Sequence, residues 1–198
     1  SENNMVELVL DIRSSFGYID GDLQTFALDI GSIEYDAFIE ADGQYDFVLN
    51  LSALKHVRSE KDPYTLMRMI DVNVFNTDKT IQQSIDNGVK KYFCVSTDKA
   101  ANPINVYGAS KLASDKIFIA GNHLAGNIKS RFAVVRYGNV IGSRGSIYWV
   151  LKDAIKNKSK TIPITDKRMT RFWIELEQGV EFVLSSLDNM TGGEIYVP

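Results

Sequence analysis

The stretch Tyr92-Phe-Cys-Val-Ser-Thr-Asp-Lys99, followed by Tyr107-Gly-Ala-Ser-Lys111, indicates the fold of this chain more clearly than any other part of it. Its first five residues are typical of a buried strand, and the strand ends in a polar cluster. A loop containing Pro103 follows, and then a predicted helix carries Tyr107 and Lys111. Sites of α/β proteins lie at the carboxyl ends of strands. The stretch therefore predicts a strand–loop–helix unit with a functional site at its polar junction.

The same stretch contains two acid–base pairs. Tyr107 and Lys111 are four residues apart, so on a helix they share a face. There the lysine charge favours phenolate, and we expect it to lower the pKa of Tyr107 towards neutrality. Such a tyrosine can take the proton from a substrate hydroxyl while a nicotinamide takes the hydride. Asp98 and Lys99 form a second pair, which plain alcohol oxidation does not need.

Length and composition predict a single soluble domain, with 198 residues of which 44% are hydrophobic. A net charge of −3 gives no electrostatic footprint for nucleic acid or an anionic membrane. No apolar run approaches the ~18 residues of a membrane span, and no signal peptide opens the chain. Cys94 is the single cysteine, and no Cys/His cluster has metal-ligand spacing. We therefore expect a reduced thiol, no metal and a cytoplasmic location.

Strand-like and helix-like segments alternate along the chain. The apolar run 45–51 is typical of a strand covered on both faces, and Pro63 and Gly88 mark the start and end of a long helix. The alternation predicts an α/β fold with a doubly wound, Rossmann-like parallel sheet. The expected strands are 24–30, 45–51, 91–96, 131–137 and 194–197, with a short extended segment at 161–164; the expected helices are 4–16, 35–41, 63–87, 106–127, 146–157 and 175–187.

One feature of dinucleotide-binding folds is missing from the sequence. Such folds open with a strand, a Gly-rich turn and a helix, whereas this chain opens with a predicted helix and contains no Gly-x-Gly-x-x-Gly. The glycine-rich stretch 138–145 has a different spacing and comes late. We therefore expect a sheet that lacks its first strand and phosphate loop. Residues 1–137 would form a partial dinucleotide-binding domain with the catalytic motifs, and residues 138–198 a mixed Rossmann and substrate-binding region.

Five stretches carry a resemblance to a known family: Leu51-Ser-Ala-Leu-Lys-His-Val57, Ser96-Thr-Asp-Lys-Ala-Ala-Asn-Pro103, Tyr107-Gly-Ala-Ser-Lys-Leu-Ala-Ser-Asp-Lys116, Arg136-Tyr-Gly-Asn-Val-Ile-Gly-Ser-Arg-Gly145 and Met169-Thr-Arg-Phe-Trp173. Together they resemble the extended short-chain dehydrogenase/reductases, specifically the UDP-N-acetylglucosamine 4,6-dehydratase group of polysaccharide biosynthesis. The resemblance runs over nearly all of the chain. With tyrosine at position 107 the chain resembles the soluble, inverting branch of the group, because the membrane-bound, retaining relatives tend to have Met at this position.

The resemblance implies a catalytic role for each of five residues. Tyr107 would take the proton of the sugar 4-hydroxyl, and Thr97 would bond the 4-oxygen. Lys99 would remove the C5 proton, and Asp98 would protonate the departing 6-hydroxyl. Lys111 would hold the nicotinamide ribose and tune the tyrosine. Hydride would then return to C6, and reprotonation of C5 from the opposite face would give inversion.

The implied ligands are NADP or NAD and a UDP-sugar, and the implied assembly is a homo-oligomer formed through helices 63–87 and 106–127. The second-strand residue that distinguishes the two cofactors is absent from the sequence. The expected cofactor-binding residues are Asp29, Ile30, Leu51, Ser52, Ala53, Asn73, Ser96, Tyr107 and Lys111. The expected substrate-binding residues are Lys55, Asn139, Arg144, Thr165 and Arg171.

Other interpretations stay open. Asp98 and Lys99 taken alone could be a solvated turn pair, and Asp29 could cap a helix. Asn50-Leu51-Ser52 also replaces the more usual His-Ala-Ala of the family. A UDP-sugar 4-epimerase would need the Tyr–Lys pair but no Asp–Lys pair. A non-catalytic remnant or self-associating module is the third hypothesis, and the missing Gly-rich loop favours it.

Overall fold

The computed structural model describes residues 2–18, 23–55, 60–143, 145–159, 161–162, 164 and 166–198. They form two compact units, Ser1–Asp42 and Gly43–Pro198, each described by itself. The boundary expected between residues 137 and 138 divides the predicted cofactor-binding region from the predicted substrate-binding region. It does not coincide with the boundary between the compact units, and it stays a prediction. No helix in the described ranges is both long and apolar enough to cross a membrane.

The first unit contains two helices, α1 (Glu2–Phe16) and α2 (Ile33–Asp42). Both were expected, but the strand predicted at 24–30 is wrong, because residues 23–29 have no regular structure. A strand needs a hydrogen-bonded neighbour, and the described part of this unit contains no second strand. Phe26 instead packs on Phe38 of α2, with ring centroids 4.6 Å apart.

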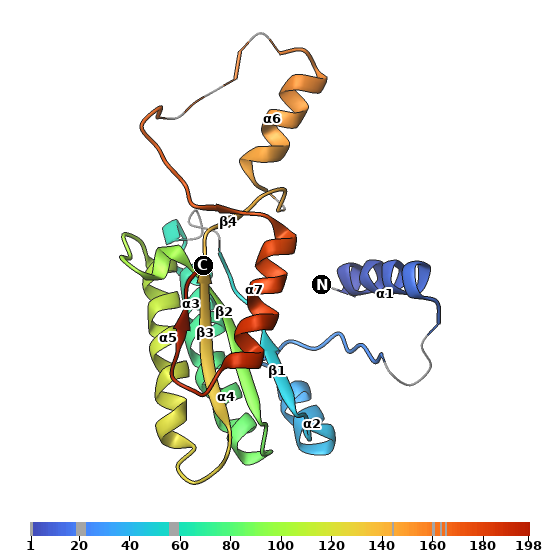
Figure 1. Ribbon diagram of the computed structural model, residues 1–198, viewed down its shortest axis with the longest axis vertical. Coiled ribbons are helices and arrows are strands. Elements are labelled where there is room, and N and C mark those ends of the chain that lie inside the picture. Colours follow the sequence, from blue (N-terminus) through green and yellow to red (C-terminus); the bar gives the residue numbers. More distant parts are fainter. Residues whose placement is uncertain are drawn as a thin grey trace. The chain divides into compact units, whose positions relative to one another are not determined.

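The second unit is built on a parallel sheet (Figure 1). Its four strands in the described ranges are β1 (Phe47–Asn50), β2 (Lys91–Thr97), β3 (Arg131–Tyr137) and β6 (Ile195–Tyr196), in the order β1-β2-β3-β6. All neighbouring pairs are parallel, and Thr97 at the end of β2 lies beside Tyr137 at the end of β3. The predicted parallel α/β fold is therefore confirmed.

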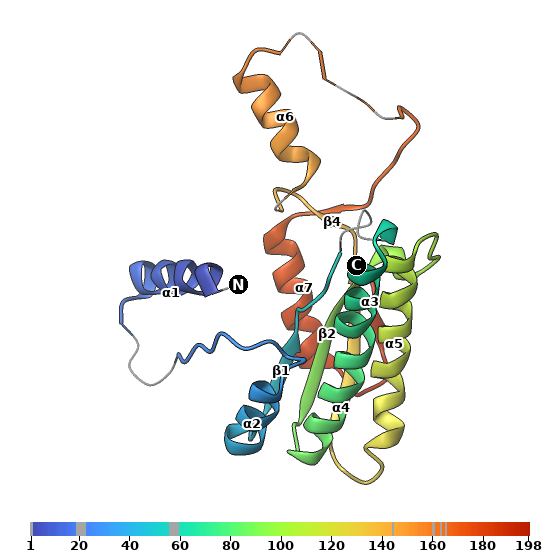
Figure 2. The same cartoon turned by 180° about the vertical axis from the view of Figure 1, so that it is seen from behind.

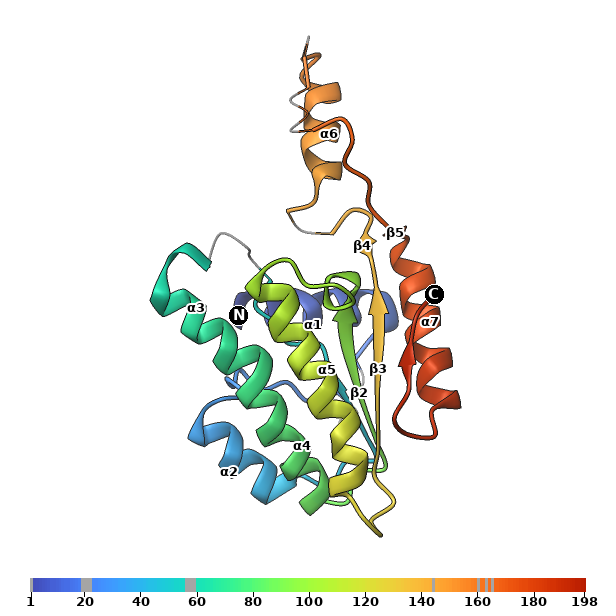
Figure 3. The same ribbon diagram turned by 90° about the vertical axis from the view of Figure 1, so that its left-hand side faces the viewer.

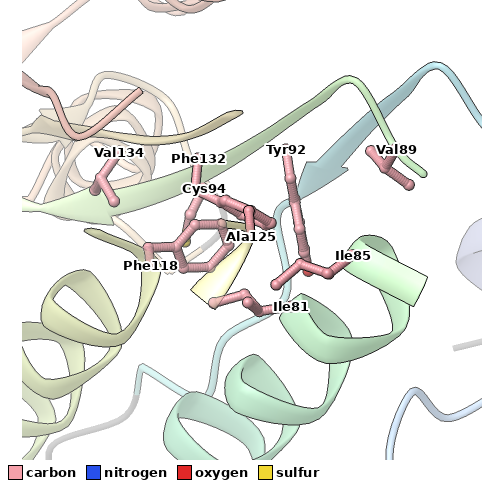
Figure 4. Packing of buried hydrophobic residues seen from close by; sticks show 9 residues of the cluster. All are labelled: Ile81, Ile85, Val89, Tyr92, Cys94, Phe118, Ala125, Phe132 and Val134. Carbon is pink, nitrogen blue, oxygen red and sulfur yellow. The ribbon is translucent and has the colours of Figure 1, made fainter. Parts of the chain in front are cut away.

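Helices cover both faces of this sheet, as Figure 3 shows. On one face, α5 (Val106–Leu124) packs against β2 and β3, and α4 (Asn76–Asp86) packs against α5. Figure 2 shows the two helices side by side. Figure 4 shows the core on that face, where Phe118 of α5 lies against Phe132 of β3. On the other face, α7 (Leu176–Asn189) covers Phe93 and Val135. The buried strands alternate their side chains between two cores, as a doubly covered sheet requires.

The long helix predicted at 63–87 is interrupted. It consists of α3 (Pro63–Ile70), a π-helical turn at Asp71–Phe75 and α4. In the turn, the backbone N–H of Asn76 donates to the carbonyl of Asp71, five residues back. π-Helical turns inside helices are frequent at functional sites, and this one is centred on Asn73, a predicted site residue.

A second, two-stranded sheet lies beyond the carboxyl end of β3. Its strands are β4 (Asn139–Val140) and β5 (Trp173–Ile174), which pair in parallel, with α6 (Ile147–Lys156) between them in sequence. Both strands were missed from the sequence, in which residues 138–145 are a glycine-rich stretch and residues 161–164 were expected to be an extended segment. Residues 161, 162 and 164 lie outside any strand, and residue 163 lies outside the described residues. Two-residue strands are too short to leave a periodic signal.

Candidate active site

The predicted polar cluster follows β2 directly, on a 3-10 turn at Asp98–Ala100. Thr97 Oγ1 donates to Asp98 Oδ1 at 2.9 Å, and Lys99 Nζ donates to the same oxygen at 2.9 Å. The side chains of Lys99 and Asp98 are 37% and 25% exposed. The pair is therefore half-shielded and reachable from solvent, unlike a fully solvated turn pair.

Asn139 extends this cluster from a different element. Lys99 Nζ donates to Asn139 Oδ1 at 3.1 Å, across a sequence distance of 40 residues. β4 holds Asn139 in place, because its backbone N–H donates to the carbonyl of Phe172 at 2.8 Å. A Cβ on Gly138 would lie 2.3 Å from that carbonyl, so only glycine permits β4 to approach so closely. The structure thus joins a predicted substrate-binding residue to a predicted catalytic one.

The start of α5 presents Tyr107 to the cluster. Asn105 caps the helix by accepting from the Gly108 N–H at 2.8 Å. Glu60 Oε1 accepts from the Tyr107 N–H at 2.9 Å, and so ties the segment before α3 to this helix start. A Cβ on Gly108 would lie 2.6 Å from the carbonyl of Lys99. The glycine within Tyr107-Gly-Ala-Ser-Lys111 therefore permits α5 to pack directly on the Asp98–Ala100 turn.

The expected lowering of the Tyr107 pKa is wrong. Burial raises the pKa of Tyr107 above its ordinary value, a hydrogen bond with Thr97 opposes this rise, and the carboxylates of Asp98 and Asp115 add to it. Tyr107 is 9% exposed, so desolvation of a phenolate is costly there. The reasoning from helical spacing considered only the lysine charge and left out the two carboxylates and the burial.

Lys111 shares the predicted helix face with Tyr107 and lies deeper, with 2% exposure. Its Nζ donates to the Val95 carbonyl of β2 at 3.2 Å and lies 3.9 Å from Cys94 Sγ. Thr97, Asp98, Lys99 and Tyr107 therefore converge as predicted, while the Lys111 ammonium lies behind them against β2. Burial also raises the pKa of the Cys94 thiol, chiefly by desolvation.

Asn73 links the π-helical turn to the segment that leaves β1. Its Oδ1 accepts from the Leu54 N–H at 2.9 Å, and its Nδ2 donates to the Leu54 carbonyl at 3.0 Å and to Ser110 Oγ at 3.0 Å. Asn50 Oδ1 holds the same segment by accepting from Ser52 Oγ at 2.7 Å. The predicted cofactor-binding residues Leu51, Ser52 and Ala53 are exposed, on a backbone fixed at both ends.

Comparison with known proteins identifies the family. The model of the polysaccharide biosynthesis protein family matches residues 4–198. The chain belongs to this family. Two inverting UDP-N-acetylglucosamine 4,6-dehydratases, from Campylobacter jejuni subsp. jejuni strains 81-176 and NCTC 11168, are 54% and 53% identical to it over 153 residues, which is 77% of this chain and 45% of each relative. The chain thus spans about half the length of these curated relatives.

More distant relatives include proteins named for a different activity. A UDP-glucose 4-epimerase of Rickettsia rickettsii is 35% identical over 169 residues, 85% of this chain and 49% of the relative. Among solved structures, Pen from Bacillus thuringiensis matches with a TM-score of 0.86 at 30% identity, over 100% of this chain and 58% of that chain. The dTDP-glucose 4,6-dehydratase DesIV from Streptomyces venezuelae, solved with NAD and TYD bound, matches with a TM-score of 0.75 at 22% identity, over 93% and 61%.

Two further predicted residues of the second unit, Lys55 and Arg171, have no described contact with the cluster. Lys55 is exposed. Arg171 Nη1 donates to the carbonyl of the preceding residue, Thr170, at 2.7 Å. Asp29 Oδ1 accepts from the Gly31 N–H at 2.9 Å, in a turn that leads into α2. Asp29 and Ile30 belong to the first unit, and their role at a cofactor stays a prediction. Arg144 and Thr165 lie outside the described residues.

Three charged residues near the cluster were missed by sequence reasoning. Glu60 contacts Tyr107 across 47 residues, which no local pattern reveals. Asp115 and Arg136 form a buried ion pair at 2.7 Å behind Lys111. Asp115 follows Lys111 by four residues, so the helical spacing that paired Tyr107 with Lys111 also indicates Asp115. Ser96, a predicted cofactor contact, is 6% exposed and its hydroxyl faces Asp115.

Proposed function

We propose that this chain carries the acid–base centre of a nucleotide-sugar 4,6-dehydratase that converts UDP-N-acetylglucosamine to a UDP-linked 4-keto-6-deoxy sugar, with inversion at C5. The observation that supports it most directly is the Asp98–Lys99 contact at 2.9 Å, placed between Thr97 and Asn139. The elimination step needs one base and one acid on neighbouring sugar carbons. Identity of 54% to inverting dehydratases supports the same reaction.

The Asp98–Lys99 contact suits this elimination. Movement of one proton along the contact converts the ion pair into a neutral amine and a carboxylic acid. The Lys99 amine can then take the C5 proton while Asp98 gives its proton to the departing 6-hydroxyl, which leaves as water. The pair returns to its charged form, so atoms and charges balance without any further group.

Tyr107 and Thr97 would act on the sugar 4-oxygen. Thr97 can hold this oxygen by a hydrogen bond, and Tyr107 can exchange a proton with it. Because the pKa of Tyr107 is raised, the tyrosine is held as phenol until the local charges change. Asn139, which bonds Lys99, would fix the base relative to the sugar.

The residues present fit the nicotinamide end of NAD or NADP, which supplies a hydride acceptor and donor when it is bound. Leu51–Ala53 are exposed at the carboxyl end of β1, and Asn73 and Asn50 fix their backbone. Ser110 on α5 joins them through Asn73. The second-strand residue that distinguishes the two cofactors is absent from the sequence, so we propose NAD or NADP binding without choosing between them.

A product assay tests the proposal. The chain would be incubated with UDP-N-acetylglucosamine and NAD or NADP, with the Campylobacter jejuni dehydratase as positive control, and the sugar nucleotide would be analysed by mass. Loss of one water is the expected result. A product of unchanged mass with an altered C4 configuration would instead establish the 4-epimerase alternative, which the 35% identity to Rickettsia epimerases supports.

Absence of both product and bound cofactor would establish the third hypothesis, a non-catalytic remnant. The assay would be accompanied by the intact mass of the purified protein and by a titration with NAD and NADP. A cytoplasmic location and homo-oligomerisation belong to the same proposal.

A further inference from the structure

A buried relay of hydrogen bonds runs from α4 through β2 to the end of β1. Thr80 Oγ1 donates to the Asn76 carbonyl at 2.8 Å, and Tyr92 Oη donates to Thr80 Oγ1 at 2.8 Å. Asn50 Nδ2 donates in turn to Tyr92 Oη at 3.2 Å. The exposed fractions of Thr80, Tyr92 and Asn50 are 5%, 2% and 8%. The Thr80–Tyr92–Asn50 relay is therefore shielded from exchange with water.

The direction of each donor in this relay follows from its α4 end. A backbone carbonyl only accepts, so the Thr80 hydroxyl gives its proton to Asn76 and accepts from Tyr92. Tyr92 gives its one proton to Thr80, so it accepts from Asn50. Only the nitrogen of the Asn50 amide can donate there. The amide oxygen is therefore turned the other way, towards the segment that leaves β1.

Ser52 meets that amide oxygen with two donors. Its backbone N–H and its hydroxyl donate to Asn50 Oδ1 at 3.0 and 2.7 Å. The backbone contact requires the same amide direction as the relay does, because an N–H cannot donate to Nδ2. The hydroxyl has a single proton, and the contact with Asn50 uses it. Ser52 Oγ therefore offers a lone pair to any further partner and acts as a hydrogen-bond acceptor.

Ser52 lies at the edge of the sheet where the proposed site is. β1 and β2 are parallel, so the segment after Asn50 leaves the sheet at the same edge as Thr97 and Asp98. Ligands of open α/β sheets bind outside the carboxyl ends of the strands. Ser52 is exposed there, whereas Asn50 behind it is buried. An exposed acceptor is thus held by a buried polar network at the ligand-binding edge.

A turn alone does not need this arrangement. An Asn side chain that accepts from the backbone N–H two residues on is a common turn device, and the backbone contact suffices for it. The contact from Ser52 Oγ is additional, and enclosing the polar groups of the relay is costly unless each is paired. Positions 50 and 52, which both depart from the His-Ala-Ala usual in the resembled family, meet in this contact. The arrangement therefore indicates a function for the polarity of the Ser52 hydroxyl.

We propose that Ser52 Oγ accepts a hydrogen bond from a hydroxyl group of the bound ligand, and that Asn50 is the positioning residue that holds Ser52 in this polarity. A hydroxyl of a nucleotide ribose and a hydroxyl of a hexose share this chemistry. A diphosphate or carboxylate group only accepts hydrogen bonds, so it finds no donor at Ser52 Oγ. The inference rests on the proposed function, which supplies both classes of ligand.

Ligand binding measured by calorimetry, without turnover, tests the proposal. NAD, NADP and UDP-N-acetylglucosamine are titrated separately into the full chain, so the ligand that is affected identifies the source of the hydroxyl. Ser52→Ala removes the acceptor, and the loss of one neutral hydrogen bond is expected to raise the Kd about 3- to 10-fold. Ser52→Thr keeps the hydroxyl and is expected to bind within about 2-fold of the wild type. Ser185→Ala, at an exposed position of α7, is the matched control.

A double-mutant cycle tests the role of Asn50. Asn50→Ala releases the Ser52 hydroxyl from its acceptor, so Ser52 no longer presents a fixed lone pair. In the Asn50→Ala background, Ser52→Ala is therefore expected to raise the Kd by less than about 2-fold. An Asn50 that only supports the fold would give the same fold change in both backgrounds. Without ligand, hydrogen exchange at the Ser52 N–H should accelerate in Asn50→Ala, while amides of β3 keep their protection.

Three outcomes of the binding experiment overturn the proposal. They are wild-type affinity of Ser52→Ala for every ligand, an equal loss in Ser185→Ala, and an equal loss for the cofactors and the sugar nucleotide. Failure of the wild-type chain to bind any of the three ligands overturns it as well. The proposed function fails by a different observation, the absence of water loss from the sugar nucleotide. A chain that binds a ligand through Ser52 without dehydrating the sugar would refute that function and keep this inference.

Circular dichroism establishes that each variant is folded. If Asn50→Ala does not fold, Asn50→Ala/Tyr92→Phe removes both partners of the buried hydrogen bond and takes its place in the cycle. The same reduced effect of Ser52→Ala is expected in that background. An undiminished effect there, or loss of folding in both backgrounds, overturns the positioning role and assigns the relay to the fold alone.

Discussion

At the scale of single residues, Lys99 separates the two enzymatic hypotheses. Its Nζ contacts Asp98 and Asn139, at 2.9 and 3.1 Å. A 4-epimerase has no step that removes the C5 proton, so its mechanism would not need this amine. A dehydratase cannot proceed past oxidation at C4 without a base in that position. The consequences of removing Lys99 therefore differ between the two reactions.

We predict that Lys99→Met prevents formation of the 6-deoxy product, because no base remains to remove the C5 proton. A single positioned acid or base contributes about 10²–10⁴-fold to a rate. Oxidation at C4 remains possible, so reduced nicotinamide and a 4-keto sugar are expected to accumulate. Nicotinamide absorbance and mass analysis of the sugar nucleotide measure the two species. Lys116→Met, on the exposed side of α5, is the control, and normal dehydration by Lys99→Met would refute the role.

Gly108 is the second decisive residue, for a steric reason. We predict that Gly108→Ala destabilises the protein by about 1–3 kcal/mol, the usual range for overpacking, because its Cβ would lie 2.6 Å from the Lys99 carbonyl. Gly179→Ala in α7 is the matched control, since its Cβ would meet only Ile174 Cδ1 at 3.9 Å. Alanine there should stabilise by up to about 1 kcal/mol. Thermal and urea unfolding measure both, and equal effects would contradict the steric explanation.

At the scale of elements, the π-helical turn is the feature that positions the segment after β1. The extra residue in the turn directs Asn73 towards Leu54 and Ser110, so one side chain bonds a loop and a second helix. Asn73 is 1% exposed, so solvent does not reach its amide to replace these partners. The turn thus joins α3 and α4 to α5 and to the predicted cofactor segment 51–54.

We predict that Asn73→Ala destabilises the protein by about 1–3 kcal/mol, because the partners of a buried amide lose their hydrogen bonds. The Leu54 N–H should lose protection in hydrogen exchange, while amides in β2 and β3 keep theirs. Gln82→Ala, at an exposed position of α4, is the control. Retained protection of Leu54 in Asn73→Ala would show that another contact holds this segment.

At the scale of the whole molecule, α3 and the π-helical turn that follows it carry exposed apolar side chains. Tyr64 and Met67 of α3 and Phe75 of the π-helical turn are 82%, 67% and 62% exposed. Exposed apolar groups of this size in one region usually mark an interface. They lie on the first of the two helices, 63–87 and 106–127, for which self-association is predicted from the sequence.

We predict that the chain self-associates at micromolar concentration through the helices expected at 63–87 and 106–127, which are α3 with α4, and α5. Analytical ultracentrifugation measures the state, and Met67→Glu should shift it towards monomer because a charge would be buried in the contact. Ile155→Glu is the control, since Ile155 on α6 is 74% exposed and distant in sequence from the proposed interface. A monomeric parent chain, or equal effects of both substitutions, would count against this interface.

Much of this arrangement could be read from local patterns. β2, α5 and β3 follow from apolar runs, caps and spacing within about 20 residues, and the convergence of Thr97, Asp98, Lys99 and Tyr107 follows from their places at the end of β2 and the start of α5. The strand at 24–30 was wrongly predicted because a strand requires a partner, which sequence patterns do not supply. β4 and β5 were missed because a strand of two residues is too short to show an alternation of apolar and polar side chains.

Local sequence patterns were sufficient to predict the parallel α/β fold, the family and the four side chains at the end of β2 and the start of α5. The burial of that site and the groups that surround it came only from the folded chain. Burial and the carboxylates of Asp98 and Asp115 raise the Tyr107 pKa, where the lysine alone would lower it. Glu60, Asn73, Asn139 and Arg136 reach the site from distant elements. The physical reason is that helical and strand periodicity is local, whereas desolvation and Coulomb interactions depend on every group that folding brings near.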